Sequence, residues 1–292
     1  MRRIVILGHS GFLGRALHAH LECEGRCEVL GFSSTEADLR REEGVRALAG
    51  WVNRETVVVF ASAITREKGD TLGTLIDNVA MAGHLAAVLE AHPPERCVCF
   101  SSDAVYPMRD EIIREGTPVS PGGTFYAIAK YTAECVLRRS LEPKGIPLLV
   151  LRPTAVFGAG DTHNSYGPNA FIRSAIRGRA VRLFGHGEER RDHLYVGDLV
   201  SIVARLIDIG AVGVLNVATG VSRSFAEVVE VLRHIVPFEL AVSYLPRTGP
   251  VTHREFDISS LRSVVGEFAF SSLEDAMRST FTQMSAAAGA PP

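Results

Sequence analysis

A glycine-rich turn directly after the first apolar run is the feature that most constrains the fold of this chain. Residues 4–7 are Ile-Val-Ile-Leu, and Gly8-His9-Ser10-Gly11-Phe12-Leu13-Gly14 follows at once and opens a segment of helical character. Glycines at this spacing let the backbone turn tightly and approach a pyrophosphate, whose charge is attracted by the N–H groups and the positive dipole end of the helix. The turn predicts a dinucleotide site; the alternative is a tight turn without a ligand.

Short apolar runs alternate with longer helical segments through the first half of the chain. This alternation is typical of repeated βαβ units, which build a parallel sheet covered by helices. The expected strands are 4–7, 28–32, 57–60, 97–101 and 148–151, and the expected helices are 12–22, 42–53, 72–92 and 124–139. We therefore expect an α/β protein with a Rossmann-type doubly wound parallel sheet and a smaller C-terminal α/β substrate lobe.

The rhythm changes after Arg152-Pro153. Residues 158–188 are rich in Gly, Asn and His with one helix-like piece at 170–177, whereas 196–209 and 213–217 are expected to return to the main sheet as a helix and a strand. Helices near 224–235 and 272–284 complete the lobe. The predicted division is residues 1–157 with 189–219 as the dinucleotide-binding domain, 158–188 with 220–285 as the substrate lobe, and 286–292 as a disordered tail.

Composition narrows the choice of partners. The 292 residues are 46% hydrophobic, with a net charge of −2 and a pI of about 6.6, and no basic stripe points to nucleic acid or an anionic membrane. No stretch approaches the ~20 apolar residues of a membrane span, and the first apolar run is too short for a signal peptide. The five cysteines lack a second matching pair or a histidine cluster, so no metal is expected. A soluble cytoplasmic protein with a small polar or anionic ligand follows.

A Tyr-x-x-x-Lys pair is the strongest chemical signal. Tyr126 and Lys130 stand four residues apart, so on a helix they share a face and the ammonium lies near the phenol. A nearby cation lowers the tyrosine pKa from about 10 towards the working pH, as a proton donor and acceptor for a sugar or alcohol hydroxyl needs. The alternative is a surface tyrosine beside a solvated lysine.

The end of the second expected strand bears on the choice of cofactor. NAD-binding folds usually place an acid there for the ribose hydroxyls, but this chain has Gly31-Phe32-Ser33-Ser34. Both serines are able to donate hydrogen bonds to a 2′-phosphate, and Arg15 is a source of positive charge. NAD(P) is expected with NADP favoured, although Glu36 and Asp38 lie close enough in sequence to serve NAD instead.

Taken together, these residues resemble the extended short-chain dehydrogenase/reductases, the NAD-dependent epimerase/dehydratase family that acts mainly on nucleotide sugars. Residues 100–106, Phe-Ser-Ser-Asp-Ala-Val-Tyr, resemble the family's strand-end SS-x-x-V-Y segment, which gives Ser102 a catalytic role beside Tyr126 and Lys130. Further matches are Ala61-Ser62-Ala63, Asn78-Val79, 151–158 (similar to LRPTNVYG), 190–198 (similar to RDFVYVDD), Asn216 and the Arg-x-x-Asp element at 254–257.

The resemblance also implies which residues contact the ligands. The implied cofactor-binding residues are Gly8, Ser10, Gly11, Phe12, Leu13, Gly14, Ser33, Ser34, Asp38, Leu39, Ala61, Ser62, Ala63, Asn78, Tyr126, Lys130 and Pro153. The implied substrate-binding residues are Ser102, Asp103, Arg191 and Arg254. In relatives an arginine at the position of Arg191 binds the nucleotide diphosphate; the alternative for Arg191 is an ion pair with Asp192 or Glu189.

Two departures from the family pattern limit the activity. Ala155 replaces the asparagine that contacts the nucleotide portion in relatives, and Ala104 replaces the glutamate of the sugar dehydratases, which disfavours dehydration. The resemblance then implies hydride transfer at a sugar carbon, expected to be C4 of a nucleotide sugar, with Tyr126 as acid and base.

Several questions stay open at the level of the sequence. It does not separate an epimerase from a reductase. A reductase of a non-nucleotide keto or hydroxy substrate and a non-catalytic dinucleotide-binding sensor are the alternative functions. Relatives pair through two long helices, which implies a homodimer through 72–92 and 124–139.

Overall fold

The computed structural model describes residues 2–109, 111–162 and 166–289 and is built around a six-stranded parallel sheet. The strand order is β10-β6-β4-β3-β1-β2. The bounds are β1 Arg3–Leu7, β2 Glu28–Phe32, β3 Thr56–Phe60, β4 Arg96–Phe100, β6 Leu148–Pro153 and β10 Gly213–Val217. Every neighbouring pair in this sheet is parallel. The doubly wound α/β fold predicted from the apolar runs is confirmed.

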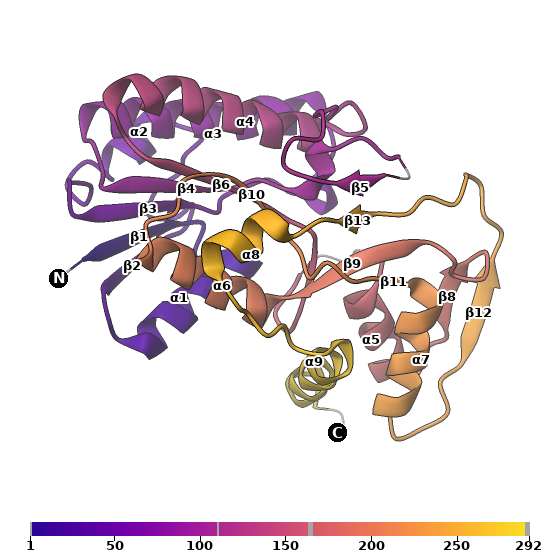
Figure 1. Ribbon diagram of the computed structural model, residues 1–292. Coiled ribbons are helices and arrows are strands. Elements are labelled where there is room, and N and C mark those ends of the chain that lie inside the picture. The colour runs from indigo at the N-terminus through magenta and orange to yellow at the C-terminus, as the bar shows by residue number, and fades with distance from the viewer. Residues whose placement is uncertain (1, 110, 163–165, 290–292) are drawn as a thin grey trace.

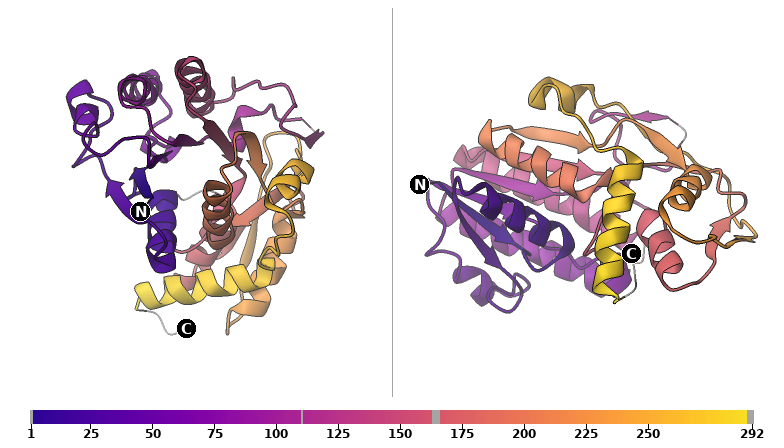
Figure 2. Two further views of the ribbon diagram at one scale, coloured as in Figure 1. Left: turned by 60° about the vertical axis from the view of Figure 1, so that its left-hand side comes forward. Right: turned by 90° about the horizontal axis from the view of Figure 1, so that it is seen from below.

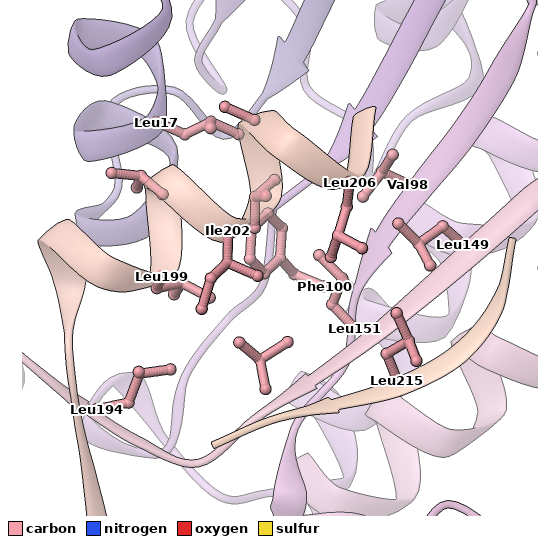
Figure 3. Packing of buried hydrophobic residues seen from close by; sticks show 14 of the residues in the cluster. Leu17, Val98, Phe100, Leu149, Leu151, Leu194, Leu199, Ile202, Leu206 and Leu215 are labelled. Carbon is pink, nitrogen blue, oxygen red and sulfur yellow. The ribbon is translucent and has the colours of Figure 1, made fainter. Parts of the chain in front are cut away.

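Helices cover both faces of this sheet (Figures 1 and 2). One face carries α1 Phe12–Glu24 and α6 Val196–Asp208, and the other carries α2 Glu42–Arg46, α3 Leu72–Ala91 and α4 Phe125–Leu141. The α6 face is apolar, with Leu199, Ile202 and Leu206 packed over Phe100 and Leu151 (Figure 3). Burial on both faces explains why the central strands are continuous apolar runs.

Helix α3 corrects the expectation that no stretch of the chain approaches the length and apolar character of a membrane span. Its 20 residues make it long and apolar enough to cross a membrane by length and composition. Its buried residues Met81, Leu85 and Leu89 belong to the core between the sheet and the helices, and it lies beside α4 on one sheet face (Figure 1). Length and apolar composition here also suit a core helix.

The second lobe contains three small sheets. Strands β7 Ala155–Phe157, β9 Arg190–Tyr195 and β11 Ser222–Ser224 form one, β8 Val181–Phe184 pairs with β12 Val242–Leu245, and β5 Ile112–Ile113 pairs with β13 Glu255–Phe256. The helices are α5 Pro168–Ile176, α7 Phe225–Ile235, α8 Ser259–Val265 and α9 Leu273–Ala287. A separate apolar core includes Phe157, Phe171, Phe225, Leu232 and Met277.

Several boundaries differ from those expected. Helix α2 ends at Arg46 and turns follow where a helix to residue 53 was expected, while α9 continues to Ala287, into the segment expected to be a disordered tail. Residues 290–292 lie outside the described residues. The chain returns to the main sheet through α6 and β10, whereas β9 belongs to the three-stranded sheet.

Candidate active site

The glycine turn joins β1 to α1 through close backbone packing. Gly8 has φ 87°, and a Cβ there would come within 2.9 Å of the Ser62 Cα; a Cβ on Gly14 would overlap the Gly8 carbonyl. Helix α1 begins at Phe12 after Gly11, whose N–H donates to the Gly8 oxygen at 3.0 Å. The packing of the turn thus requires both glycines, and the first-turn N–H groups of α1 point out of the helix, which fits a bound pyrophosphate.

The turn after β3 is held by Asn78 on α3. The Ile64 N–H donates to Asn78 Oδ1 at 2.8 Å, and Asn78 Nδ2 donates to the Ile64 oxygen at 3.0 Å. These two bonds fix the segment that contains Ser62 and Ala63. Asn78 is buried, so in this structure its amide shapes the turn.

Tyr126 and Lys130 lie in the first two turns of α4, where Thr124 caps the helix by accepting from the Ala127 N–H at 3.0 Å. Lys130 is buried, and its Nζ donates to the Phe100 oxygen at 2.7 Å and lies 5.7 Å from the centroid of the Tyr126 ring. The cation therefore lies close to the phenol, as the spacing predicts. The Tyr126 N–H donates to Asp70 Oδ1 at 3.0 Å, a contact that sequence reasoning missed.

One pocket collects residues from four parts of the chain. Its lining includes five predicted cofactor residues from the turn after β3, from α3 and from α4, namely Ser62, Ala63, Asn78, Tyr126 and Lys130. Phe60, Phe100, Ala129 and Ala133 complete it. Residues predicted separately from short motifs thus meet at the carboxyl ends of β3 and β4, where ligands bind in open α/β sheets.

Ser102 begins the short 3₁₀ turn η2 Asp103–Val105, directly after β4. Its Oγ accepts from the Ala104 N–H at 3.1 Å and donates to Asp103 Oδ1 at 3.4 Å. Since Lys130 holds the Phe100 carbonyl two residues earlier, the turn has a fixed position relative to α4. The catalytic roles of Ser102, Tyr126 and Lys130 stay predictions.

Arg254 supports this turn from the second lobe. Its Nη1 donates to the Asp103 oxygen at 2.7 Å and to Asp103 Oδ2 at 2.9 Å, while Nη2 donates to the Tyr106 oxygen at 2.9 Å and Nε contacts the Met108 sulfur at 3.2 Å. The two residues predicted to bind substrate, Asp103 and Arg254, are therefore bonded to each other. Arg254 is 5% exposed.

Arg191 lies on β9 and is engaged mainly with backbone. Its Nη1 donates to the Thr252 oxygen at 2.7 Å and to the Arg190 oxygen at 2.8 Å, and Glu189 Oε1 is 3.9 Å from Nη2. Burial lowers the pKa of the Arg191 guanidinium. The neighbouring Asp192 accepts instead from backbone N–H groups of residues 219 and 220. Of the two alternative ion-pair partners, Glu189 is the one in range.

The end of β2 differs from the arrangement expected for a 2′-phosphate. The Ser33 N–H donates to Glu36 Oε2 at 2.8 Å and its hydroxyl donates to the same oxygen; these bonds lower the pKa of Glu36. Asp38 is paired with Arg40 at 2.8 Å. Arg15 donates to the Gly160 oxygen at 2.8 Å, so its guanidinium is bound to the loop after β7.

The remaining predicted cofactor residues divide by exposure. Ser10, Gly11 and Ser34 are exposed, Leu13 and Ala61 are partly buried, and Phe12, Gly14, Leu39 and Pro153 are buried. The buried residues can serve cofactor binding only through their backbone or by holding the turn in place.

Sequence reasoning missed a buried polar network below the pocket. Arg152 on β6 pairs with Glu134 on α4 at 2.6 Å. The available signals were an arginine inside a buried strand and a glutamate spaced at i, i+4, i+8 behind Tyr126 and Lys130.

The doubly wound sheet, the glycine turn before α1 and the Tyr126–Lys130 pair define a Rossmann-type protein of the dehydrogenase/reductase class. The model of the NAD dependent epimerase/dehydratase family matches residues 4–218. The chain belongs to this family.

Curated relatives and solved structures agree with this assignment. The chain is 25% identical to the probable GDP-L-fucose synthase 1 of Oryza sativa subsp. japonica over 255 residues, covering 81% of this chain and 78% of that protein. It is 24% identical to the dTDP-4-dehydro-6-deoxy-D-allose reductase of Streptomyces bikiniensis, covering 80% and 81%. The fold matches the UDP-glucose 4-epimerase of Thermotoga maritima with UDP-glucose, with a TM-score of 0.86, 21% identity and coverage of 98% and 99%. The fold also matches the Thermus thermophilus UDP-glucose 4-epimerase with NAD, with a TM-score of 0.83, 21% identity and coverage of 96% of this chain and 98% of that chain.

Proposed function

We propose that this protein is an NAD(P)-dependent epimerase or reductase that moves a hydride at a sugar carbon, C4, of a nucleotide sugar. The observation that carries the proposal is the pocket in which Lys130 lies beside the Tyr126 ring, next to the Ser62–Ala63 turn. The names of the rice and Streptomyces relatives, a GDP-L-fucose synthase and a dTDP-sugar reductase, support a nucleotide sugar as substrate.

The residues present fit a bound dinucleotide. Gly8 and Gly14 permit the tight turn before α1, because Ser62 and the Gly8 carbonyl fill the space that a Cβ on each would need. The residues that would hold the cofactor are the glycine turn with the exposed Ser10, the exposed Ser34, and the pocket residues Tyr126 and Lys130. The cofactor supplies hydride chemistry when bound.

Tyr126 in this pocket and Ser102 on the turn after β4 then take part in proton transfer. Tyr126 exchanges a proton with the substrate hydroxyl, and Ser102 hydrogen-bonds the same oxygen. The Lys130 Nζ lies 5.7 Å from the centroid of the Tyr126 ring and, because it is bonded to the Phe100 carbonyl, keeps a fixed position beside it.

The substrate end is proposed to use Arg191 as a diphosphate clamp, since its Nη2 keeps hydrogen-bonding capacity beyond the Thr252 hydroxyl at 3.3 Å. Asp103 and Arg254 are proposed to act together in the same region. Their mutual bonds hold the Ser102 turn, and a ligand diphosphate would compete with Asp103 for the Arg254 guanidinium.

The choice between NAD and NADP depends on the end of β2. Ser34 is exposed and suits the NADP preference predicted from the sequence. The ionised Glu36, bonded to Ser33, weighs against that preference because its charge repels a 2′-phosphate. Comparing the dissociation constants of NADH and NADPH decides the matter, and Glu36→Gln should improve the NADPH constant alone.

The assembly and the compartment complete the proposal. Helices α3 and α4 lie side by side, and Leu72, Ile76 and Phe125 on them are exposed, which supports a homodimer through these helices. The five cysteines are free thiols, which supports a reducing cytoplasmic location. Sedimentation of the protein and of Ile76→Glu tests the dimer.

The activity is tested by following reduced-nicotinamide absorbance during incubation with nucleotide sugars and 4-keto sugars. Consumption of the reduced cofactor identifies a reductase. Inversion of the sugar without net consumption identifies an epimerase. The proposed substrate class is contradicted if no nucleotide sugar reacts in either way and a non-nucleotide keto compound is reduced.

A further inference from the structure

A buried ion pair lies beneath the Tyr126–Lys130 pair. Arg152 donates to Glu134 through Nε at 3.0 Å and Nη2 at 2.6 Å, and the two side chains are 4% and 1% exposed. Burying two charges costs desolvation, and apolar residues of similar volume often serve stability as well or better. Stability alone therefore does not account for this pair.

Three more polar side chains extend the pair into a network. Ser101 Oγ donates to Glu134 Oε1, Arg152 Nη1 donates to the Tyr106 hydroxyl at 2.8 Å, and that hydroxyl donates to Asn216 Oδ1 at 2.8 Å. Glu134, Arg152 and Asn216 lie on α4, β6 and β10, Ser101 directly follows β4, and Tyr106 directly follows η2. The network thus fixes α4 relative to three strands and to the turn that follows β4.

Two side chains of α4 hold consecutive residues of the segment that leads to Ser102. Lys130 binds the Phe100 carbonyl, and Glu134, one helical turn further on, binds the Ser101 hydroxyl. Tyr126 lies on the same face of α4, one turn in the other direction. The distance between the Tyr126 phenol and Ser102 is therefore governed by how these two bonds seat the helix.

We propose that the Glu134–Arg152 pair is a positioning element that holds Tyr126 and Lys130 against the end of β4. Within the pair, each buried charge is neutralised by the other. The inference rests on the proposed function, because it takes Tyr126 as the proton-transfer group. Glu134 acts through its neighbours, since its oxygens are occupied by Ser101 and Arg152.

The other charged and titratable groups around this face come from several elements. They are Asp70 before α3, Cys99 on β4, Asp103 and Tyr106 at η2, Glu115 beside Asn216, and Tyr131 on α4. Glu134→Gln leaves all of them in place. It also leaves Arg152 charged, because a guanidinium keeps its proton in proteins, so the variant gains one uncompensated positive charge below Lys130.

The test is a titration of the Tyr126 phenolate by its ultraviolet absorbance, isolated by subtracting the signal of Tyr126→Phe. In Glu134→Gln the midpoint should move to lower pH, because the guanidinium of Arg152 is then no longer compensated and a positive charge favours the phenolate. In Glu134→Gln/Arg152→Met the charge balance returns, and the midpoint should return to that of the wild type. A midpoint that stays fixed or rises in Glu134→Gln overturns the inference.

Two further variants separate positioning from general damage. Asp198→Asn removes another buried carboxylate, bonded to Ser271 on the opposite sheet face, and should leave the Tyr126 midpoint unmoved; an equal shift there contradicts the inference. Ser101→Ala keeps the ion pair and removes its link to β4. Its kcat should fall about threefold to tenfold with an unchanged midpoint, and an unchanged kcat also contradicts the inference.

The titration needs no substrate, so its outcome does not depend on the activity assay. A wild-type protein without turnover on any nucleotide or keto sugar contradicts the proposed function, whereas a fixed midpoint in an active enzyme contradicts only the positioning role. Where Glu134→Gln does not fold, the fall in kcat of Ser101→Ala carries the test.

Discussion

The two faces of the central sheet are built from different chemistry. On one face α6 covers the strands with aliphatic side chains, such as Ile202 and Leu206 over Phe100 (Figure 3). On the other face α4 brings Lys130 and Glu134 into the interior, where backbone and Arg152 satisfy them. Aliphatic burial stabilises the fold, whereas buried charges cost desolvation. The comparison indicates that the α6 face maintains the sheet and that the α4 face holds the reactive groups in place.

The largest effect is expected on the α4 face for Tyr126→Phe. Loss of the phenol hydroxyl removes general acid and base help, so turnover should fall about 10²- to 10⁴-fold while NAD(P)H affinity and the melting temperature stay close to those of the wild type. Stopped-flow assays and cofactor titration measure these quantities. Tyr244→Phe, the same change at a residue 58% exposed on β12, is the matched control and should keep full turnover. Full turnover in Tyr126→Phe breaks the comparison.

The opposite pattern is expected on the α6 face for Ile202→Ala. Ile202 is 0% exposed within the apolar cluster, and its truncation should lower the free energy of unfolding by about 2–5 kcal/mol through lost burial and a residual cavity. Denaturant unfolding measures the loss. At 25 °C the kcat of the folded variant should remain within about twofold of the wild type. A large fall in kcat without a loss of stability would show that the faces are not distinct in function.

Part of this division could be predicted from the sequence. Strand β3 is buried on both faces and is a continuous apolar run, so the sequence predicts its bounds to within one residue, and the glycine turn around Gly8 predicts the start of α1. In the second lobe β8 has only four residues and β13 only two. Runs this short carry no periodicity to distinguish them from loops.

The candidate site was predictable where it depends on local spacing. Tyr126 and Lys130 are neighbours on one helix, so their proximity follows from the sequence alone. The partners of Arg254 and Glu134 are 151 and 18 residues away in the chain, and only the folded arrangement of strands brings them together. For the same reason the sequence predicts a ligand contact for Arg254 but not the bonds by which its guanidinium holds the Ser102 turn.

A smaller effect is expected for Thr71→Ala at the start of α3. This change tests whether turnover depends on the whole sheet face that carries α3 and α4. Thr71 Oγ1 accepts from the Thr74 N–H at 3.2 Å, and Thr74 Oγ1 accepts from the Thr71 N–H at 3.0 Å. Removing this cap should lower the free energy of unfolding by about 1 kcal/mol, with turnover unchanged. Thr71→Ser keeps the capping oxygen and should restore most of the loss. A fall in turnover would extend the reactive region beyond α4.

The smallest effect concerns pH and the buried carboxylate of the α6 face. Burial raises the pKa of Asp198, although its bonds to the Ser271 N–H and hydroxyl at 2.9 and 2.8 Å act in the other direction. A raised folded-state pKa means that the stability contributed by this group is present below its unfolded value near 3.9 and is lost as the pH rises through the folded value. Asp198→Asn cannot ionise, so its free energy of unfolding should decline less than that of the wild type above about pH 4. Urea unfolding at a series of pH values measures the difference. Parallel curves for the two proteins would contradict a raised pKa for the Asp198 carboxyl.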